Sequence, residues 1–362
     1  MRRLFLVLII LCACFSAGAQ VWNDARALPL YGKATPETAF LYSRLPESLS
    51  GECRPPVWKR GLCSTGLFVR FRTDSPTLWV RWESVNSNVM NHMSATGSRG
   101  LDLYVLLDGS EWRFLTSAKP DLKAAVTERM IMSNMEPRMR EYMLYLSLYD
   151  GVASLQIGTE EGHDILAGEG DSPRSGRPVV MYGTSITQGG CVSRPGMLYT
   201  SILARELDRE FVNLGFSGNA FLDLEIARLM ASVPDPAAYV LAVVENASVE
   251  QFRERGEAFF HILREAHPDV PVIIVQAVRY SDSLLDSKKA ADMEARMAAC
   301  KELYDSIRKS GQKHIYFIDP GAQSSFADNE SSVDGTHLTD LGSMRFARML
   351  LPVLKKALRK TR

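Results

Sequence analysis

The stretch MYGTSITQGG, residues 181–190, ends an apolar run and sets one serine, Ser185, among three glycines. The run before it, Pro178 to Tyr182, is typical of a strand buried on both faces. In parallel sheets, ligands bind at the carboxyl ends of such strands. The stretch therefore predicts an α/β unit with Ser185 at its functional edge.

The rest of the second half repeats this rhythm of strand and helix. Further apolar strands are expected within REFVNLGFSG, AYVLAVVEN, VPVIIVQAV and KHIYFID, and helices around 198–207, 222–231, 249–266, 286–310 and 339–358. Apolar strands that alternate with helices indicate a parallel sheet covered on both sides. We assign residues 173–362 to this three-layer unit, with SPRSGRP (172–178) as the linker before it.

The first half has a different period. Segments such as GLFVRFRT (66–73), TLWVRWES (77–84) and LDLYVLLDG (101–109) alternate apolar and polar residues, with Asp-Gly turns between them. This pattern is typical of half-buried antiparallel strands joined by hairpins. Residues 20–172 are therefore predicted to form a jelly-roll-like β-sandwich.

Partners for Ser185 are available near the end of the chain. His337 lies in VDGTHLTDLG, three residues after Asp334. A serine hydroxyl needs a base to remove its proton, and a carboxylate can orient that base. The pattern predicts a catalytic triad of Ser185, Asp334 and His337.

An acyl-transfer site also needs hydrogen-bond donors for the developing oxyanion. Gly218 follows the second predicted strand and Asn246 follows the third, at the same edge of the sheet as Ser185. We expect the Ser185 and Gly218 backbone N–H groups and the Asn246 amide to form this oxyanion hole.

These residues give the second half a resemblance to SGNH (GDSL-type) hydrolases, carried by GTSITQGGCVSRPGM (183–197) and DGTHLTDLG (334–342). GLDLYVLLDG (100–109) resembles the Gly-x-Asp-Leu-Tyr signature of a β-domain that precedes some of these hydrolases in Bacteroides-like bacteria. The resemblance implies a flavodoxin-like α/β/α fold and an esterase, often one that deacetylates carbohydrates, without cofactor or metal.

The sequence departs from the family pattern at three positions. Thr184 replaces the usual Asp of the Gly-Asp-Ser triplet, and Ala242 and Glu245 replace an Asp and a Pro that often precede Asn246. We expect the Glu245 side chain to point outward. These changes bear on rate and substrate more than on reaction class.

The first nineteen residues predict export. Arg2 and Arg3 precede an apolar run that is too short to span a membrane, and Ala17-Gly18-Ala19 is typical of a signal-peptide cleavage site. Residues 1–19 are assigned as a signal peptide, which places the protein in the periplasm or outside the cell. A lipoprotein site at Cys14, with a lipid anchor in the outer membrane, is the alternative.

Four cysteines remain after such a cleavage. Export permits disulfides, and a disulfide between Cys53 and Cys63 could staple the Pro-rich stretch between them, although four cysteines allow three full pairings and the sequence does not choose among them. The histidines show no metal-ligand spacing, so no metal site is predicted. His92, in NVMNHMSATG, is expected to pack at a domain face, and a ligand-contacting or inter-domain role is the alternative.

The balance of charged residues gives no indication of a nucleic-acid partner. Lys plus Arg and Asp plus Glu both number 42, so the formal net charge is zero and nothing indicates nucleic-acid binding. The leading prediction is an exported serine esterase that hydrolyses short-chain, above all acetyl, esters on carbohydrates. The alternatives are a lipase- or thioesterase-like acylhydrolase and a carbohydrate-binding protein with weak catalysis.

Overall fold

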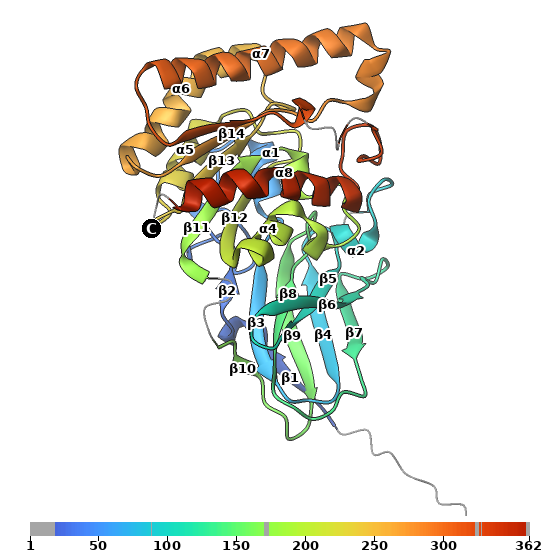
Figure 1. Ribbon diagram of the computed structural model, residues 1–362. Helices are drawn as coiled ribbons and strands as arrows, with labels where there is room; N and C mark the ends of the chain where they lie inside the picture. The colour runs from blue at the N-terminus through green and yellow to red at the C-terminus, as the bar shows by residue number, and fades with distance from the viewer. Residues whose placement is uncertain (1–18, 88, 170–173, 323–325, 327, 360–362) are drawn as a thin grey trace, which may run out of the picture.

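The computed structural model describes residues 19–87, 89–169, 174–322, 326 and 328–359. A β-rich unit lies at one end of the molecule and an α/β unit at the other (Figure 1). The predicted signal peptide and Cys14 lie outside the described residues, apart from Ala19. None of the described helices is both long enough and apolar enough to cross a bilayer.

The β-rich unit consists of two antiparallel sheets packed face to face. Their strand orders are β1-β9-β4-β7 and β10-β3-β8-β5-β6, with β2 added to β3. The strands are β1 (Gln20–Asp24), β2 (Leu30–Tyr31), β3 (Phe68–Thr73), β4 (Leu78–Ser84), β5 (Leu101–Leu107), β6 (Glu111–Ala118), β7 (Val126–Met132), β8 (Arg140–Tyr145), β9 (Val152–Glu160) and β10 (Leu166–Ala167). Two short helices, α1 (Pro55–Gly61) and α2 (Ala95–Ser98), interrupt this order.

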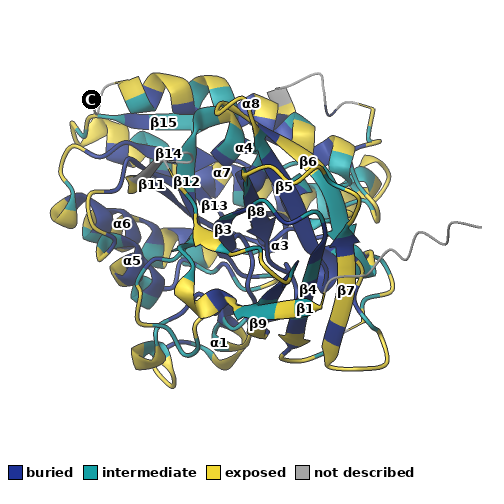
Figure 2. Cartoon of the chain, turned by 90° about the horizontal axis from the view of Figure 1, so that it is seen from below, coloured by how far each residue is buried: buried dark blue, intermediate teal, exposed yellow. Residues whose placement is uncertain are grey.

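Alternation along the strands builds the core between the two sheets. Leu78, Val80 and Trp82 of β4 point into it, whereas Arg81 between them is partly exposed. Seen from below, the central strands are dark while the edge strand β7 is largely exposed (Figure 2). The predicted antiparallel β-domain is confirmed.

The α/β unit holds one parallel sheet of order β12-β11-β13-β14-β15. Counted along the chain this is 2-1-3-4-5, the flavodoxin-like order. Its elements are β11 (Arg174–Gly183), α3 (Ser185–Gln188), α4 (Tyr199–Leu207), β12 (Arg209–Gly215), α5 (Leu224–Ala231), β13 (Ala238–Ala242), α6 (Val249–Ala266), β14 (Val272–Val275), α7 (Ser287–Lys309), β15 (Ile315–Ile318) and α8 (Asp340–Leu358).

Helices cover both faces of this sheet (Figure 1). Val180 and Tyr182 of β11 pack in one core with residues of α5, α6 and α7. Their neighbours Val179 and Met181 point to the other face and pack with α4 and α8. Because every second residue of a strand faces the same side, an entirely apolar β11 requires a layer on each face. The predicted three-layer α/β/α fold is confirmed.

The division of the chain into two units at the predicted linker does not match the way the residues pack in the structure. β11 begins at Arg174, inside the predicted linker. Ala34, Leu45 and Val57 from the first half pack in the same core as β11 and β12 of the second. Much of the segment from Ala34 to Cys63, including Val57 of α1, thus covers the α/β unit, although Tyr42 within it packs in the core of the β-sandwich.

The possible Cys53–Cys63 disulfide is not formed in the structure, and both residues are buried free thiols. Residues 55–61 form helix α1 instead of a tight loop. Seven helical residues span about 10 Å, whereas a disulfide needs Cα atoms within roughly 7 Å of each other. Cys53 packs in the core of the α/β unit, which holds it away from Cys63.

Candidate active site

Ser185 and His337 meet at the carboxyl edge of the parallel sheet. Ser185 is the first residue of α3, directly after β11, and His337 lies in the loop before α8. The Ser185 Oγ is 2.9 Å from the His337 Nε2, and the His337 Nδ1 is 2.7 Å from the Asp334 Oδ2. The structure therefore brings together the three residues of the predicted triad.

Asp334 is held in place by the loop that carries His337. Its Oδ1 accepts hydrogen bonds from the backbone N–H groups of Thr336 and His337, at 3.0 and 2.8 Å. Partial burial acts to raise the pKa of Asp334, but the hydrogen bonds from the His337 backbone and ring and from Thr336 outweigh it and lower the pKa to about 2. An ionised carboxylate can only accept, so the His337 Nδ1 carries the proton and Nε2 is free to accept from Ser185.

The turn that carries Ser185 is fixed by its neighbours. Thr184 caps α3 and accepts a hydrogen bond from the Ile186 N–H. The Tyr149 hydroxyl, from the β-rich unit, donates to the Ser185 carbonyl at 3.2 Å. A Cβ added at Gly190 would lie 2.7 Å from that hydroxyl, so the close approach requires glycine.

The Glu245 side chain was expected to point outward, but it points inward. Burial raises the pKa of its carboxyl group to about 7, against hydrogen bonds from the backbone N–H groups of Glu245 and Val278 and from the Thr184 hydroxyl. These donors hold the carboxyl group at the ends of β11, β13 and β14. Thr184 and Glu245, two of the departures from the family pattern, thus interact with each other beside the nucleophile turn.

The predicted oxyanion-hole residues flank Ser185. Gly218 follows β12 and Asn246 follows β13, the two strands on either side of β11. Gly218 has a φ of 68°, and a Cβ at this position would meet nothing within 4 Å. The Asn246 Oδ1 accepts from the Ala220 N–H at 3.2 Å, which leaves the Nδ2 hydrogens for another acceptor. Their role in oxyanion binding stays a prediction.

Buried amides that the sequence analysis did not select connect these loops. Gln188, fully buried at the end of α3, accepts from the Ser217 N–H at 2.8 Å, next to Gly218. Asn213 of β12 donates to the Thr187 carbonyl at 2.7 Å. Their contacts are formed only by the tertiary structure, so no local sequence pattern could have identified them.

Two family models match the chain over most of its length. The GDSL-like lipase/acylhydrolase family matches residues 176–355, and the N-terminal domain of SGNH-hydrolase-type esterases, named after its Gly-x-Asp-Leu-Tyr motif, matches residues 20–165. The fold is similar to that of a protein from Bacteroides ovatus ATCC 8483 described as a GDSL-like lipase, with 33% sequence identity, a TM-score of 0.88, and coverage of 94% of this chain and 98% of that one.

The chain belongs to the GDSL-like lipase/acylhydrolase family. It is therefore an esterase or acylhydrolase of the SGNH type. No curated protein sequence matches it.

More distant structures share the fold of this GDSL-like hydrolase. The salicylyl-acyltransferase SsfX3 from a tetracycline biosynthetic pathway is 20% identical, with a TM-score of 0.72 over 93% of this chain and 98% of that one. A family two carbohydrate esterase from Clostridium thermocellum, in complex with cellohexaose, is 16% identical, with a TM-score of 0.59 over 82% and 94%.

The Gly-x-Asp-Leu-Tyr motif of this hydrolase contacts the loop that leads from the nucleophile to α4. Asp102, fully buried on β5, accepts from the Arg194 guanidinium at 2.9 Å and from the Gly196 N–H at 2.8 Å. The Tyr104 hydroxyl accepts from Arg194 at 2.7 Å. The motif therefore joins the β-rich unit to the active-site loop.

His92 lies where the two units meet, which agrees with the inter-domain alternative rather than with simple packing at a domain face. It is partly exposed, and its ring centroid lies 5.6 Å from that of His337. Cys191 lies beside both histidines, and burial raises the pKa of its thiol to about 12. The loop before α2 thus brings a residue of the β-rich unit to the edge of the triad.

Proposed function

We propose that the protein is an exported serine esterase that removes short acyl groups, above all acetyl, from carbohydrates. The continuous set of hydrogen bonds from Asp334 through His337 to Ser185 carries the proposal. An ionised carboxylate, a histidine in one tautomer and an activated hydroxyl are the groups that acyl transfer by a serine requires.

In the proposed reaction the Ser185 Oγ attacks the ester carbonyl while His337 Nε2 takes the hydroxyl proton. Asp334 stabilises the imidazolium that forms. The Ser185 and Gly218 N–H groups and the Asn246 Nδ2 stabilise the oxyanion of the tetrahedral intermediate. His337 then protonates the leaving sugar oxygen, and an acyl group remains on Ser185.

The second half of the reaction uses the same groups in reverse. His337 accepts a proton from water, which attacks the acyl-serine carbonyl. The oxyanion hole stabilises the second tetrahedral intermediate, and His337 returns the proton to the Ser185 Oγ as the carboxylic acid leaves. Each proton removed in acylation or deacylation is thus returned in the same half-reaction.

The exposure of the triad supports a bulky substrate with a small acyl group. The side chains of His337 and Asp334 are 23% and 34% exposed, so the triad opens toward the surface on the histidine side, although Ser185 itself is 7% exposed. A polymeric sugar can approach such a site without entering a deep channel. The fold shared with a carbohydrate esterase in complex with cellohexaose agrees with this substrate class.

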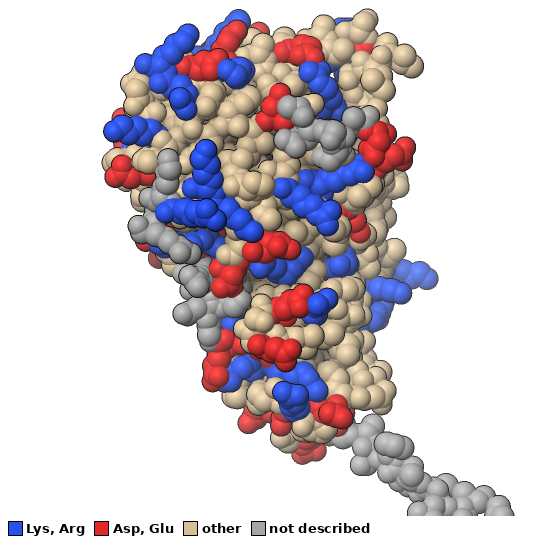
Figure 3. Space-filling view, in the orientation of Figure 1, with Lys and Arg blue, Asp and Glu red and all other residues tan. Residues whose placement is uncertain are grey.

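The charge distribution is compatible with a neutral substrate. Acidic and basic side chains occur together over both units on the face that Figure 3 shows. A carbohydrate ester carries no charge that a surface of one sign would have to attract.

The first test is ester hydrolysis over a series of acyl lengths. Wild type, Ser185→Ala and the exposed-turn control Ser110→Ala would be assayed on p-nitrophenyl acetate, butyrate and octanoate and on acetylated xylan. We expect wild type and the control to release acetate fastest, and Ser185→Ala to lose on the order of 10⁴-fold or more in kcat.

Other outcomes would select an alternative. Faster turnover of octanoate than of acetate would favour a lipase- or thioesterase-like acylhydrolase. Equal rates for wild type and Ser185→Ala on every ester, together with binding of the polysaccharide, would replace the esterase proposal with a carbohydrate-binding protein.

Export is tested separately by the mass of the mature protein. Cleavage after Ala19 would give a chain that begins with Gln20, whereas lipid attachment would leave Cys14 as the modified first residue. A full-length chain in the cytoplasmic fraction would contradict both.

A further inference from the structure

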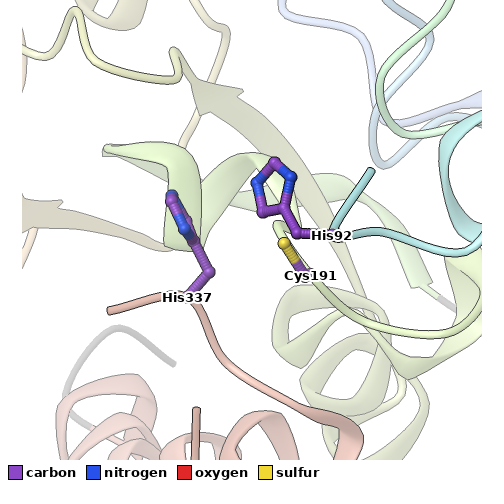
Figure 4. A group of neighbouring side chains, drawn as sticks. All are labelled: His92, Cys191 and His337. Atoms are coloured by element: carbon purple, nitrogen blue, oxygen red, sulfur yellow. The ribbon is translucent and has the colours of Figure 1, made fainter. Parts of the chain in front are cut away.

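Three side chains with metal-binding atoms meet at the edge of the triad. The ligand atoms of His92, Cys191 and His337 all lie within 4.8 Å of one another. The three residues come from three separate segments, and Figure 4 shows the two imidazole rings side by side, tilted by 57°, with the Cys191 sulfur beside them. The β-rich unit supplies His92, and the α/β unit supplies the other two.

The chemistry of the set suits a borderline or soft divalent cation. Two imidazole nitrogens and one thiolate match the ligands of Zn²⁺ sites that keep a fourth position for water. Hard cations such as Mg²⁺ and Ca²⁺ prefer oxygen ligands and would bind poorly here.

Each histidine already has an oxygen partner on one ring nitrogen. The His337 Nδ1 bonds to the Asp334 carboxylate at 2.7 Å, and the His92 Nδ1 lies 3.0 Å from the Asn91 Oδ1. A metal-bound histidine typically donates its second N–H to such an oxygen, which sets the tautomer and orients the ring. In both residues Nε2 is therefore the nitrogen left for a metal.

We infer that His92, Cys191 and His337 form an inhibitory Zn²⁺ site that spans the two units of the esterase. The His337 Nε2 lone pair that would bind the metal is the one that accepts the Ser185 hydroxyl proton, at 2.9 Å. Zinc and the catalytic hydrogen bond thus exclude each other. Binding converts the Cys191 thiol to a thiolate, releases one proton to solvent and changes no oxidation state.

The site needs a small contraction before it can close on the ion. In a tetrahedral Zn²⁺ site with these ligands, ligand atoms are roughly 3.4–3.6 Å apart, whereas the limit here is 4.8 Å, so the ligand atoms would have to move closer by no more than about 1.4 Å. His92 can supply this movement, because it is partly exposed and lies outside a helix or strand. Zinc would therefore also hold the His92 loop against the α/β unit.

The test measures metal binding independently of turnover. Zn²⁺ would be titrated by calorimetry into Ser185→Ala, which keeps all three ligands, and into the same variant with His92→Ala or Cys191→Ser added. We expect one equivalent to bind to Ser185→Ala and each ligand change to weaken binding at least about tenfold. His163→Ala, which alters a histidine paired with Asp74, is the matched control and should bind as tightly as its parent.

Two further readouts give the location and the effect of the ion. Co²⁺ in place of Zn²⁺ should give a sulfur-to-metal charge-transfer band that Cys191→Ser lacks. Zn²⁺, but not Mg²⁺, should inhibit ester hydrolysis by the Ser185-intact enzyme, a chelator should reverse the inhibition, and His92→Ala should require at least about tenfold more Zn²⁺ for the same inhibition.

The inference is overturned if Zn²⁺ up to millimolar concentration does not bind to Ser185→Ala, or if it binds equally well after His92→Ala. Circular dichroism and melting curves would check that each variant is folded, and if Cys191→Ser is not, the His92→Ala pair decides. An inactive wild type that still binds one Zn²⁺ at these residues would contradict the esterase proposal and the inhibitory role, and would leave the metal site itself standing.

Discussion

Ser185 and His337 stand 152 positions apart in sequence, yet the Ser185 Oγ lies 2.9 Å from the His337 Nε2. Two hydrogen bonds donated by backbone N–H groups keep these two residues close. The Cys191 N–H donates to the Leu338 carbonyl at 3.0 Å, and the Asp340 carboxylate accepts from the Ser193 N–H at 2.8 Å. The nucleophile loop and the histidine loop are thus bonded directly to each other.

Replacing Asp334 by Asn should reduce kcat by about 10⁴-fold, because the wrong His337 tautomer would be favoured. The melting temperature should change little, since the amide oxygen can still accept from the Thr336 and His337 N–H groups. Asp328→Asn, at an exposed pair with Arg345, is the control and should keep full activity. A kcat near wild type in Asp334→Asn would remove Asp334 from the triad.

Replacing Asn246 by Ala should reduce kcat by about 10²–10³-fold with little change in KM, because an oxyanion donor acts on the transition state. Steady-state kinetics on p-nitrophenyl acetate would separate the two constants. A rise in KM with kcat unchanged would instead place Asn246 in ground-state binding.

Glu245→Gln should change how stability depends on pH. The unfolded carboxyl group titrates near 4.5, whereas burial raises the folded pKa to about 7, so the folded state binds more protons in this window and loses stability as pH rises through it. The glutamine cannot ionise, so the variant should melt at a more constant temperature between pH 5 and pH 8.

The control for this measurement is Glu254→Gln, an exposed glutamate on α6. It should show the wild-type dependence of melting temperature on pH. If Glu245→Gln shows the same dependence as well, the Glu245 carboxyl group is not the titrating group.

Asp102→Asn should destabilise the protein by about 1–3 kcal/mol, because the fully buried side chain loses its charge-assisted hydrogen bonds while the Arg194 guanidinium, 20% exposed, keeps some contact with water. Urea unfolding would measure the loss. Asp108→Asn, at an exposed turn that tolerates asparagine, is the matched control and should be nearly neutral. Equal stability of the two variants would mean that the Asp102–Arg194 pair does not hold the units together.

The four cysteines of the described residues should all titrate as free thiols once the purified, exported protein is unfolded without reductant. Reductant should leave the melting temperature unchanged. Two missing thiols, with a mass lower by two hydrogens, would restore the disulfide that the structure does not form.

Features whose sequence signal lies within one short segment were predicted correctly. The apolar strands and amphipathic helices of the second half were predicted within a few residues, since each signal lies inside a single segment; α6 has the predicted bounds, Val249–Ala266. The triad could also be proposed, because Asp334 and His337 are close in sequence and Ser185 follows a recognisable strand. The Tyr149 and Gln188 contacts depend on segments that are distant in sequence, so no pattern carried them.

The errors have the same cause. The direction of Glu245 depends on donors at Thr184 and Val278, which follow two other strands, β11 and β14. Cys53 looked close to Cys63 only because the helix between them was not foreseen. His92 showed no metal-ligand spacing because its neighbours Cys191 and His337 come from the other unit.

The buried Arg44 has a consequence for how this enzyme could be divided. Its guanidinium donates to the carbonyls of Asn213 and Gly215, at 3.0 and 2.9 Å, at the end of β12. A hydrolase fragment cut at the linker would lose this cover and expose the apolar surface beneath α1. Residues 34–63 precede most of the sandwich strands in the sequence. An exchange of the β-sandwich for another module would therefore succeed only if these residues remained with the catalytic half.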